Sequence, residues 1–528
     1  MAFRHAFIFS ALAFLAVMTG ITVQWPATAW LWSIAGPILA LGAYDLLQRR
    51  HTLLRIYPVI GHFRYLFESV RRELQQYFVE SDLDGRPINR EFRSLIYQRA
   101  KKDNDTRAFG TIFDVYRDGY EWLNQSLAPK ACRNANLRVQ FGKGRCSQPY
   151  DAAPLNISAM SYGALSRNAI MALNRGAKLG NFAHNTGEGG ISEWHLRHEG
   201  DLIWQIGTGY FGCRDQEGRF DPRLFACEAA RDQVKMIEIK LSQGAKPGHG
   251  GVLPASKLTE EIARIRMVPM GEDVLSPPGH SAFSNPTELL VFVRKLRALS
   301  GGKPVGFKLC PGNRQEFLGI CKAMTETGLL PDFITIDGGE GGTGAAPVEL
   351  TNSVGMPLRD GLQFVHNALK GIGVRDQIRL IASGKVFSAF HMLRLMTLGA
   401  DTLNSARGMM LALGCIQSRS CNTDRCPTGV ATTNPARYQQ LDVTDKGVRV
   451  ANYQHSTVDA LAELVGILGL DKLEDLRPRH LNRRVSQYKV MNYAQLYPEL
   501  ETGCLLRRNC APEDWAEDWQ LAQSDRWQ

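Results

Sequence analysis

The chain has 528 residues, 44% of them hydrophobic, and its 62 Lys and Arg against 52 Asp and Glu give a formal net charge of +10. This length exceeds a single ordinary small domain, and the hydrophobic fraction is typical of a globular protein with a sizeable core. No tract of Lys or Arg predicts a nucleic-acid partner, and the modest basic excess is better matched to an anionic membrane surface and anionic ligands. The 11 cysteines are odd in number and irregularly spaced, which excludes a secreted disulfide framework and favours a reducing compartment.

Two apolar runs lie at the start of the chain. Ala6–Val23 and Ala29–Leu47 each approach the roughly 20 residues that a membrane-spanning helix needs. Trp25 and two further tryptophans lie where an aromatic belt is expected, and basic residues flank both outer ends. The pattern predicts a transmembrane hairpin over residues 1–50, in the inner (cytoplasmic) membrane, with the remainder of the chain in the cytoplasm. A signal peptide cleaved after residue 29 is the alternative.

An α/β barrel is predicted downstream. Residues 51–150 are charged and indicate a helical and irregular connector, after which short β-branched runs alternate with amphipathic stretches. Eight such runs predict a (β/α)8 TIM barrel over residues 151–437, with its active site on the loops that follow the strands. Residues 438–528 predict a helical and irregular extension. The predicted strands are 155–160, 181–186, 202–207, 236–242, 304–309, 333–338, 379–384 and 401–406.

Two neighbouring loops are candidates for a phosphate site. The seventh predicted strand ends at Ser383, Gly384 and Lys385, and the eighth leads into Arg407 and Gly408 at the start of a helix. Glycine lets the backbone approach a phosphate, and the loops after strands seven and eight of such barrels commonly bind one. Tight turns that need glycine are the alternative for each loop alone. Together, with two cations, the loops favour a phosphorylated flavin.

Other strand ends extend this interpretation. Lys308 closes an apolar strand, where a cation could stabilise negative charge on a reduced flavin. The glycine-rich loop that begins at Asp337 lacks dinucleotide-binding spacing, and no Rossmann unit is recognisable, so direct reduction by NAD(P)H is not expected. The predicted cofactor contacts are Met160, Ser161, Tyr162, Gly163, Gln243, Lys308, Asp337, Gly338, Gly339, Ser383, Gly384, Lys385, Arg407 and Gly408.

Three charged residues are candidates for the substrate site. Lys240 and Lys246 lie in the basic loop after the fourth predicted strand, and Glu188 follows the second. The lysines could bind a small dicarboxylate, and the carboxylate could orient a nitrogen or take part in proton transfer. Singly, each such residue is more often a salt bridge or a loop anchor.

Cys415, Cys421 and Cys426 form a C-x5-C-x4-C pattern followed at once by proline. Thiolates this close in one loop suit a soft metal or an iron–sulfur cluster. Three of them suit a three-iron cluster, whereas structural zinc needs a fourth ligand. Zinc, and three merely buried cysteines, are the alternatives. The position one short helix beyond the candidate phosphate loop favours the cluster.

The motifs MSYGALS, NTGEGG, IKLSQGAKPGHGG, DGGEGGTGAAP and ALGC-x5-C-x4-CPTGVAT together resemble the FMN-binding synthase domain of glutamate synthase. The resemblance covers roughly residues 155–435. It implies a barrel with FMN and a [3Fe-4S] cluster on the three cysteines, which adds ammonia to 2-oxoglutarate and reduces the iminoglutarate to glutamate. It places Glu188 and Lys246 at the 2-oxo acid site. His249 and Val252 replace a carboxylate and an amide of the usual KPGEGGQLPG sequence, so a related 2-oxo acid is also a candidate substrate.

The predicted function is that of a membrane-anchored FMN and iron–sulfur oxidoreductase that makes glutamate or a related amino acid. Its predicted partners are a small anionic 2-oxo acid, ammonia and an external electron donor, either ferredoxin or a reductase subunit. The sequence begins MAFRHAF and not with the nucleophilic cysteine of a glutaminase domain, so no amidotransferase is expected. The alternatives are an oxidoreductase of the same type for another 2-oxo or imino acid, and a membrane-tethered electron-transfer subunit without its own substrate.

Overall fold

The computed structural model describes residues 2–133, 137–508 and 510–527, and the chain divides into two compact units between Glu91 and Phe92. In the first unit, α1 (Ala2–Gln24) is followed by a 3-10 turn (Pro26–Leu31) and α2 (Trp32–Leu47). By length and composition, the stretches Phe3–Gln24 and Pro26–Leu47 could each cross a membrane. The two helices pack closely, because a Cβ on Gly42 would lie 2.4 Å from the Phe7 ring.

The first unit continues with shorter helices. These are α3 (Thr52–Ile56), α4 (Gly61–Leu74) and a π-helical turn (Gln75–Val79). α5 (Arg90–Lys101) spans the boundary between the two units.

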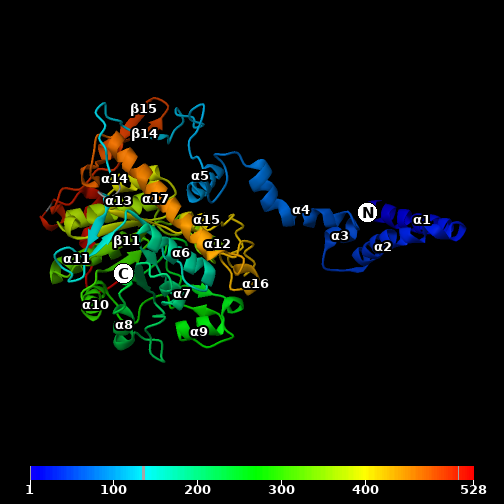
Figure 1. Ribbon diagram of the computed structural model, residues 1–528, viewed down its shortest axis with the longest axis horizontal. Coiled ribbons are helices and arrows are strands. Elements are labelled where there is room, and N and C mark those ends of the chain that lie inside the picture. The colour runs from blue at the N-terminus through cyan, green and yellow to red at the C-terminus, as the bar shows by residue number, and fades with distance from the viewer. Residues whose placement is uncertain (1, 134–136, 509, 528) are drawn as a thin grey trace. The chain divides into compact units, whose positions relative to one another are not determined.

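The second unit contains a closed barrel of eight parallel strands, surrounded by helices (Figure 1). All eight predicted strands are present, with ends that differ by up to three residues, so the (β/α)8 prediction is confirmed. The barrel strands are β4 (Leu155–Ile157), β5 (His184–Asn185), β6 (Leu202–Ile206), β7 (Val234–Lys240), β10 (Val305–Leu309), β11 (Phe333–Asp337), β12 (Arg379–Ser383) and β13 (Thr402–Ser405).

Side-chain caps fix the start of several barrel helices. The oxygens of Ser166, Asp221, Asn285, Asn313 and Ser388 each accept a backbone N–H from the first turn of the helix that follows, and these bonds satisfy donors that a helix leaves free. The helices around the barrel include α6 (Arg167–Gly180), α8 (Pro222–Ala229), α10 (Pro286–Leu299), α11 (Arg314–Thr327), α13 (Leu358–Gly371) and α14 (Ala389–Thr397).

The N-terminal end of the barrel is closed by apolar side chains. β2 (Val139–Phe141) and β3 (Tyr150–Ala152) form an antiparallel hairpin. Phe141 and Tyr150 from this hairpin share one buried cluster with Met236, Phe333 and Ile381 from three barrel strands. The hairpin therefore plugs the end of the barrel opposite to the strand C-termini.

The remaining elements lie before, between and after the barrel strands. α17 (Val443–Ile467) packs along α6, and β1 (Glu121–Leu123), β14 (Leu481–Ser486) and β15 (Lys489–Asn492) form a three-stranded sheet. The long connection after β7 contains β8 (Val252–Leu253), α9 (Glu260–Arg266) and β9 (Val274–Leu275). The shorter helices are α7 (Glu193–Leu196), α12 (Val348–Ser353), α15 (Arg407–Ala412), α16 (Pro435–Tyr438), α18 (Tyr493–Leu496) and α19 (Glu513–Leu521).

Candidate active site

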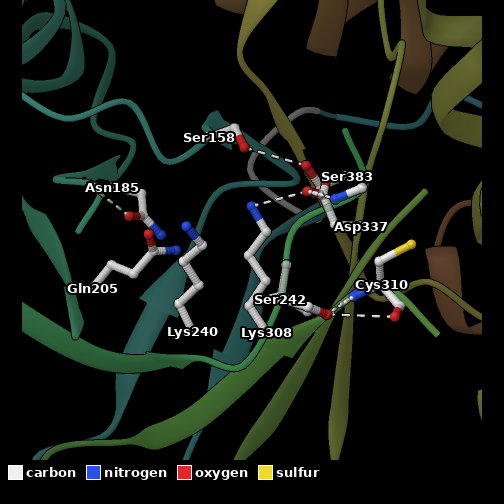
Figure 2. Close-up of polar contacts among 12 residues, drawn as sticks. Ser158, Asn185, Gln205, Lys240, Ser242, Lys308, Cys310, Asp337 and Ser383 are labelled. Atoms are coloured by element: carbon white, nitrogen blue, oxygen red, sulfur yellow. Dashed lines mark hydrogen bonds and ion pairs between the residues drawn. The ribbon is translucent and has the colours of Figure 1, made fainter. Parts of the chain in front are cut away.

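Two lysines stand side by side at the C-terminal end of the barrel. Lys240 ends β7, and Lys308 of β10 is its direct partner in the parallel register. Both side chains are buried and extend in the same direction in Figure 2. Adjacent strands lie about 5 Å apart, so these two cations need counter-charges close by.

Each lysine has a carboxylate partner from another strand end. Lys240 Nζ lies 2.6 Å from Glu188 Oε1, and Lys308 Nζ lies 3.3 Å from Asp337 Oδ2. Ser276 Oγ, in the connection after β7, donates to the second oxygen of Glu188 at 3.5 Å. The structure thus brings Glu188, Lys240, Lys308 and Asp337, four residues singled out from the sequence, to one end of the barrel.

The surrounding charges decide whether Glu188 and Lys308 are charged. Burial alone would raise the pKa of Glu188, but Lys240, Arg266 and Lys246 outweigh it and hold that pKa below its usual range. Burial would lower the pKa of Lys308, but the neighbouring carboxylates, Asp337 first, raise it overall. Glu188 is therefore ionised and Lys308 protonated near neutral pH.

Lys246 is the third cation of this site. Its side chain is only 2% exposed. Burial and the neighbouring Lys240 lower its pKa, against a smaller opposing effect of Glu188. A cation that is buried beside another cation favours an additional anion, and this is a property expected of an anion-binding site.

A buried carboxylate inside the barrel was missed by the sequence analysis. Glu238 of β7 accepts hydrogen bonds from Asn185 Nδ2 at 2.8 Å, Gln205 Nε2 at 2.7 Å and Thr335 Oγ1 at 2.6 Å. It therefore ties β5, β6 and β11 to β7 beneath the lysines. The available signal was a glutamate two residues before Lys240 in an otherwise apolar strand, because residues i and i+2 share one face.

The loops at the strand ends approach one another closely. Asp337 Oδ2 accepts the backbone N–H of Gly244 at 2.9 Å, and a Cβ on Gly244 would lie 1.8 Å from the carbonyl oxygen of Gly338. Only glycine fits at this approach. Ser158 Oγ and Ser383 Oγ lie 3.2 Å apart (Figure 2), so the ends of β4 and β12, the two neighbours of β13, are in contact.

The predicted phosphate loops have well-defined backbone geometry. Gly384 has φ of +148° and Lys385 has φ of +50°, which is the left-handed region that favours glycine. Arg407 Nη2 donates to the carbonyl oxygen of Glu340 at 2.9 Å. Arg407 is half-buried, and this partial burial lowers the pKa of its guanidinium against the opposing effects of Asp337 and Glu340. Arg407 therefore holds the glycine-rich loop after β11 in addition to any role with a ligand.

The residues of the loop after β4 differ in burial and in what they contact. Met160 is buried, and Gly163 has φ of +97°. The Tyr162 hydroxyl donates to Glu261 of α9 at 2.7 Å. The backbone carbonyl oxygen of Tyr162 accepts a hydrogen bond from Arg266 Nη2 at 3.0 Å. Tyr162 is thus anchored to α9, a contact that the sequence analysis did not predict. The predicted contacts Ser161 and Gln243 are half-buried, Gly338 and Gly408 are buried, and Gly339 is half-buried.

The cysteine loop has an unusual backbone. Gln417, Arg419 and Asp424, none of them glycine, adopt φ between +53° and +57°. Asp424 Oδ1 accepts the backbone N–H of Thr433 at 2.7 Å and Thr432 Oγ1 at 2.9 Å. Such conformations persist only where surrounding bonds enforce them, and they are frequent at functional sites.

The three thiols of this loop differ in how their surroundings shift the pKa. Burial raises the pKa of Cys415 to about 12 and raises that of Cys421. Burial would also raise the pKa of Cys426, but backbone N–H groups directed at it, that of Ala431 first, lower that pKa overall. Over the described ranges, no group of three or more His, Cys, Asp or Glu side chains is arranged to hold a metal ion.

Lys257 connects the cysteine loop to the loop after β4. It is 3% exposed. Its Nζ donates to the carbonyl oxygen of Ala164 at 3.0 Å, and to those of Cys421 and Ala431 at 3.4 Å each. Lys257 was not predicted from the sequence, because nothing in its local pattern distinguishes it from a surface lysine.

Sequence comparisons give this site its family context. The conserved region in glutamate synthase matches residues 132–471. The glutamate synthase large subunit-like protein YerD of Bacillus subtilis is 37% identical over 86% of this chain and 93% of its own length. The chain belongs to the glutamate synthase family. It is thus an oxidoreductase of the type that acts on amino-group donors.

Other members of the glutamate synthase family are matched over less of their length. The archaeal glutamate synthase [NADPH] of Methanocaldococcus jannaschii is 32% identical over 68% of this chain and 66% of its own length. Among solved structures, a mutant flavocytochrome b2 with pyruvate bound has a TM-score of 0.41 at 12% identity, covering 84% of this chain and 91% of that one. Mandelate oxidase with (S)-2-phenylpropionate has a TM-score of 0.41 at 14% identity, covering 75% and 98%.

Proposed function

We propose that the barrel binds FMN and reduces the imine formed from ammonia and a small 2-oxo acid, 2-oxoglutarate or a close relative, to the amino acid. The observation that carries the proposal is the meeting of Glu188, Lys240 and Lys308 at the barrel end beside the candidate phosphate loops. Family membership supports the reaction type. The proposed product is glutamate or a related amino acid.

The residues at the strand ends fit a phosphorylated flavin. Gly384 supplies a backbone conformation that other residues rarely adopt, and Ser383 ends a buried strand next to it. Lys308, protonated and fully inside the barrel end, can stabilise negative charge on a ring system. When bound, FMN supplies a hydride to an electrophilic carbon.

The three cations around Glu188 fit a small dianion. Lys246, Lys240 and Arg266 all act on this one carboxylate, so positive charge is in excess there. A dicarboxylate substrate would supply the missing negative charge. Glu188, held ionised, can accept a hydrogen bond from the nitrogen of the imine and so orient it toward the substrate carbon.

Cys415, Cys421 and Cys426 are the proposed ligands of a [3Fe-4S] cluster. The N–H groups directed at Cys426 and the enforced loop backbone are suited to thiolate ligands. When bound, the cluster supplies one-electron transfer. The proposed electron source is an external donor, ferredoxin or a reductase subunit. We further propose that the hairpin of α1 and α2 anchors the protein in the cytoplasmic membrane.

The test is anaerobic isolation followed by analysis of flavin, iron and acid-labile sulfide, and by turnover with a chemical reductant. We expect FMN, about three irons per chain, and amino acid formation from ammonia with 2-oxoglutarate or a relative. Lys246→Met should raise the KM for the 2-oxo acid while the flavin content stays unchanged. Cys421→Ser should lower the iron content without changing the flavin content.

Matched controls make the result specific. Cys227→Ser replaces an exposed cysteine away from the cysteine loop, and it should leave iron, flavin and turnover unchanged. Protein that contains both cofactors but binds no small 2-oxo acid would overturn the synthase proposal and support an electron-transfer subunit. Protein that binds no flavin would overturn the whole scheme.

A further inference from the structure

An apolar stripe runs along α4 in the first unit. Phe63, Leu66, Phe67, Val70 and Leu74 recur at the three- and four-residue spacing that places them on one helix face. Their side chains are between 38% and 60% exposed. Tyr77 and Phe78, 54% and 81% exposed, follow in the π-helical turn. A continuous exposed apolar surface of this kind marks an interaction site.

Basic residues flank this stripe. Arg64 and Arg71 are seven residues apart, which places both along one edge of it. From residue 48 to residue 79 the chain has six arginines against two glutamates. The segment therefore combines aromatic and aliphatic side chains on one face with a positive edge, the composition of helices that lie in a membrane interface.

α4 is also fixed to the end of the second candidate span. The Asp45 carboxylate, fully buried near the end of α2, accepts the backbone N–H of Val59 at 2.9 Å and is bonded to His62 Nε2 at 2.9 Å. Val59 has φ of +61°. This junction holds the start of α4 against the end of α2, so the stripe, which begins at Phe63 next to His62, starts close in space to the end of the second candidate span.

We propose that α4 and the turn after it lie in the plane of the membrane interface, with the stripe among the acyl chains and the arginines on anionic lipid headgroups. The proposal rests on the membrane anchorage proposed for α1 and α2. Continuity with the second span and the positive charge favour lipid over a second copy of the chain, because like-charged edges repel one another and are attracted to anionic headgroups. Aromatic side chains such as Phe63, Phe67 and Tyr77 also suit the interface.

The test uses the full chain in vesicles of phosphatidylcholine and phosphatidylglycerol. The photocrosslinker p-benzoylphenylalanine replaces Phe67 on the stripe, Ser69 at about 120° around α4 from the centre of the stripe, or Phe14 of α1. After irradiation, mass spectrometry identifies the molecule attached. We expect lipid adducts from positions 14 and 67 and none from position 69.

Each outcome decides the proposal. Lipid adducts at position 14, with attachment of position 67 to a second copy or to residues 92–527, would overturn it while leaving the anchorage intact. Lipid adducts at neither position would overturn both the anchorage and the interfacial helix. Equal lipid attachment at positions 67 and 69 would overturn the stated orientation.

A charge variant tests the role of the arginines. Arg64→Gln with Arg71→Gln should reduce lipid attachment at position 67 by about fivefold per arginine in the anionic vesicles. In pure phosphatidylcholine vesicles it should have no effect. Lys143→Gln with Arg508→Gln, two exposed residues of the second unit, is the matched control and should change neither yield. An unchanged yield with the Arg64 and Arg71 variant would overturn the headgroup contact.

Discussion

The two ends of the barrel differ in chemistry although the same strands build both. β7 carries Met236 into the apolar cluster at one end and Lys240 into the charged group at the other. β11 likewise runs from Phe333 to Asp337. At the N-terminal end the hairpin of β2 and β3 excludes water, whereas at the C-terminal end loops surround buried charges.

The closed end of the barrel therefore provides stability, and the end with the loops provides the reactive groups. Apolar burial at the closed end stabilises the fold without restricting the loops. The buried charges at the other end are costly unless each has a partner, and the pairs of Lys240 with Glu188 and Lys308 with Asp337 provide this. The loops can therefore vary around a rigid base, as in other barrels of this architecture.

The largest expected effect is at Lys308. Lys308→Met leaves Asp337 and Glu238 with an uncompensated buried charge and should destabilise the protein by about 3–5 kcal/mol, with loss of turnover. Denaturant unfolding and activity measure the two effects. Lys308→Met with Asp337→Asn removes both charges of the pair and should recover most of the stability but none of the activity. Recovery of both would show that the cation has only a structural role.

Phe333→Ala tests the closed end. Phe333 is fully buried and packs edge to face on Phe141, with ring centroids 5.8 Å apart. Its truncation should cost about 3–5 kcal/mol of stability, while turnover per folded molecule stays near the native value. Phe109→Ala, at a fully exposed position, should be neutral. A loss of turnover in the folded fraction of Phe333→Ala would contradict the separation of the two ends.

Two buried lysines provide a matched pair of smaller effect. Lys257→Met removes donors to the carbonyls of Ala164, Cys421 and Ala431, and should cost about 1–3 kcal/mol with faster hydrogen exchange in residues 415–433. Lys303→Met removes similar bonds to Ala229 and Arg231 near the closed end. It should lower stability without changing exchange in the cysteine loop. Equal exchange in both variants would refute a specific role for Lys257.

A pH dependence of stability is expected from His280. Burial lowers the pKa of His280 from 6.5 to about 4, and its ring contacts Tyr210 and the carbonyl of Lys240. As pH falls from 6.5 to about 4 the unfolded chain takes up this proton before the folded one does, so stability decreases over that range. Denaturation curves for His280→Asn should show a weaker decrease. His249→Asn, at an exposed position, is the control, and equal slopes in all three proteins would exclude His280 as a source.

Prediction from sequence worked best where the pattern was local. All eight barrel strands were found, because a buried parallel strand is a short apolar run whatever its neighbours are. Lys240 and Lys308 stood out as charges at the ends of such runs. Glu238 did not, although it lies on the same face of the same strand, because its three partners come from β5, β6 and β11.

The sequence by itself determined the barrel, the family and the residues with chemical potential, because apolar periodicity and motif spacing depend only on nearby positions. The tertiary structure alone decided which of these residues meet. It paired Glu188 with Lys240 across 52 residues and brought Lys257 to Cys421 across 164. Ring closure of the sheet produces such contacts, and no local pattern encodes which strand end will face which.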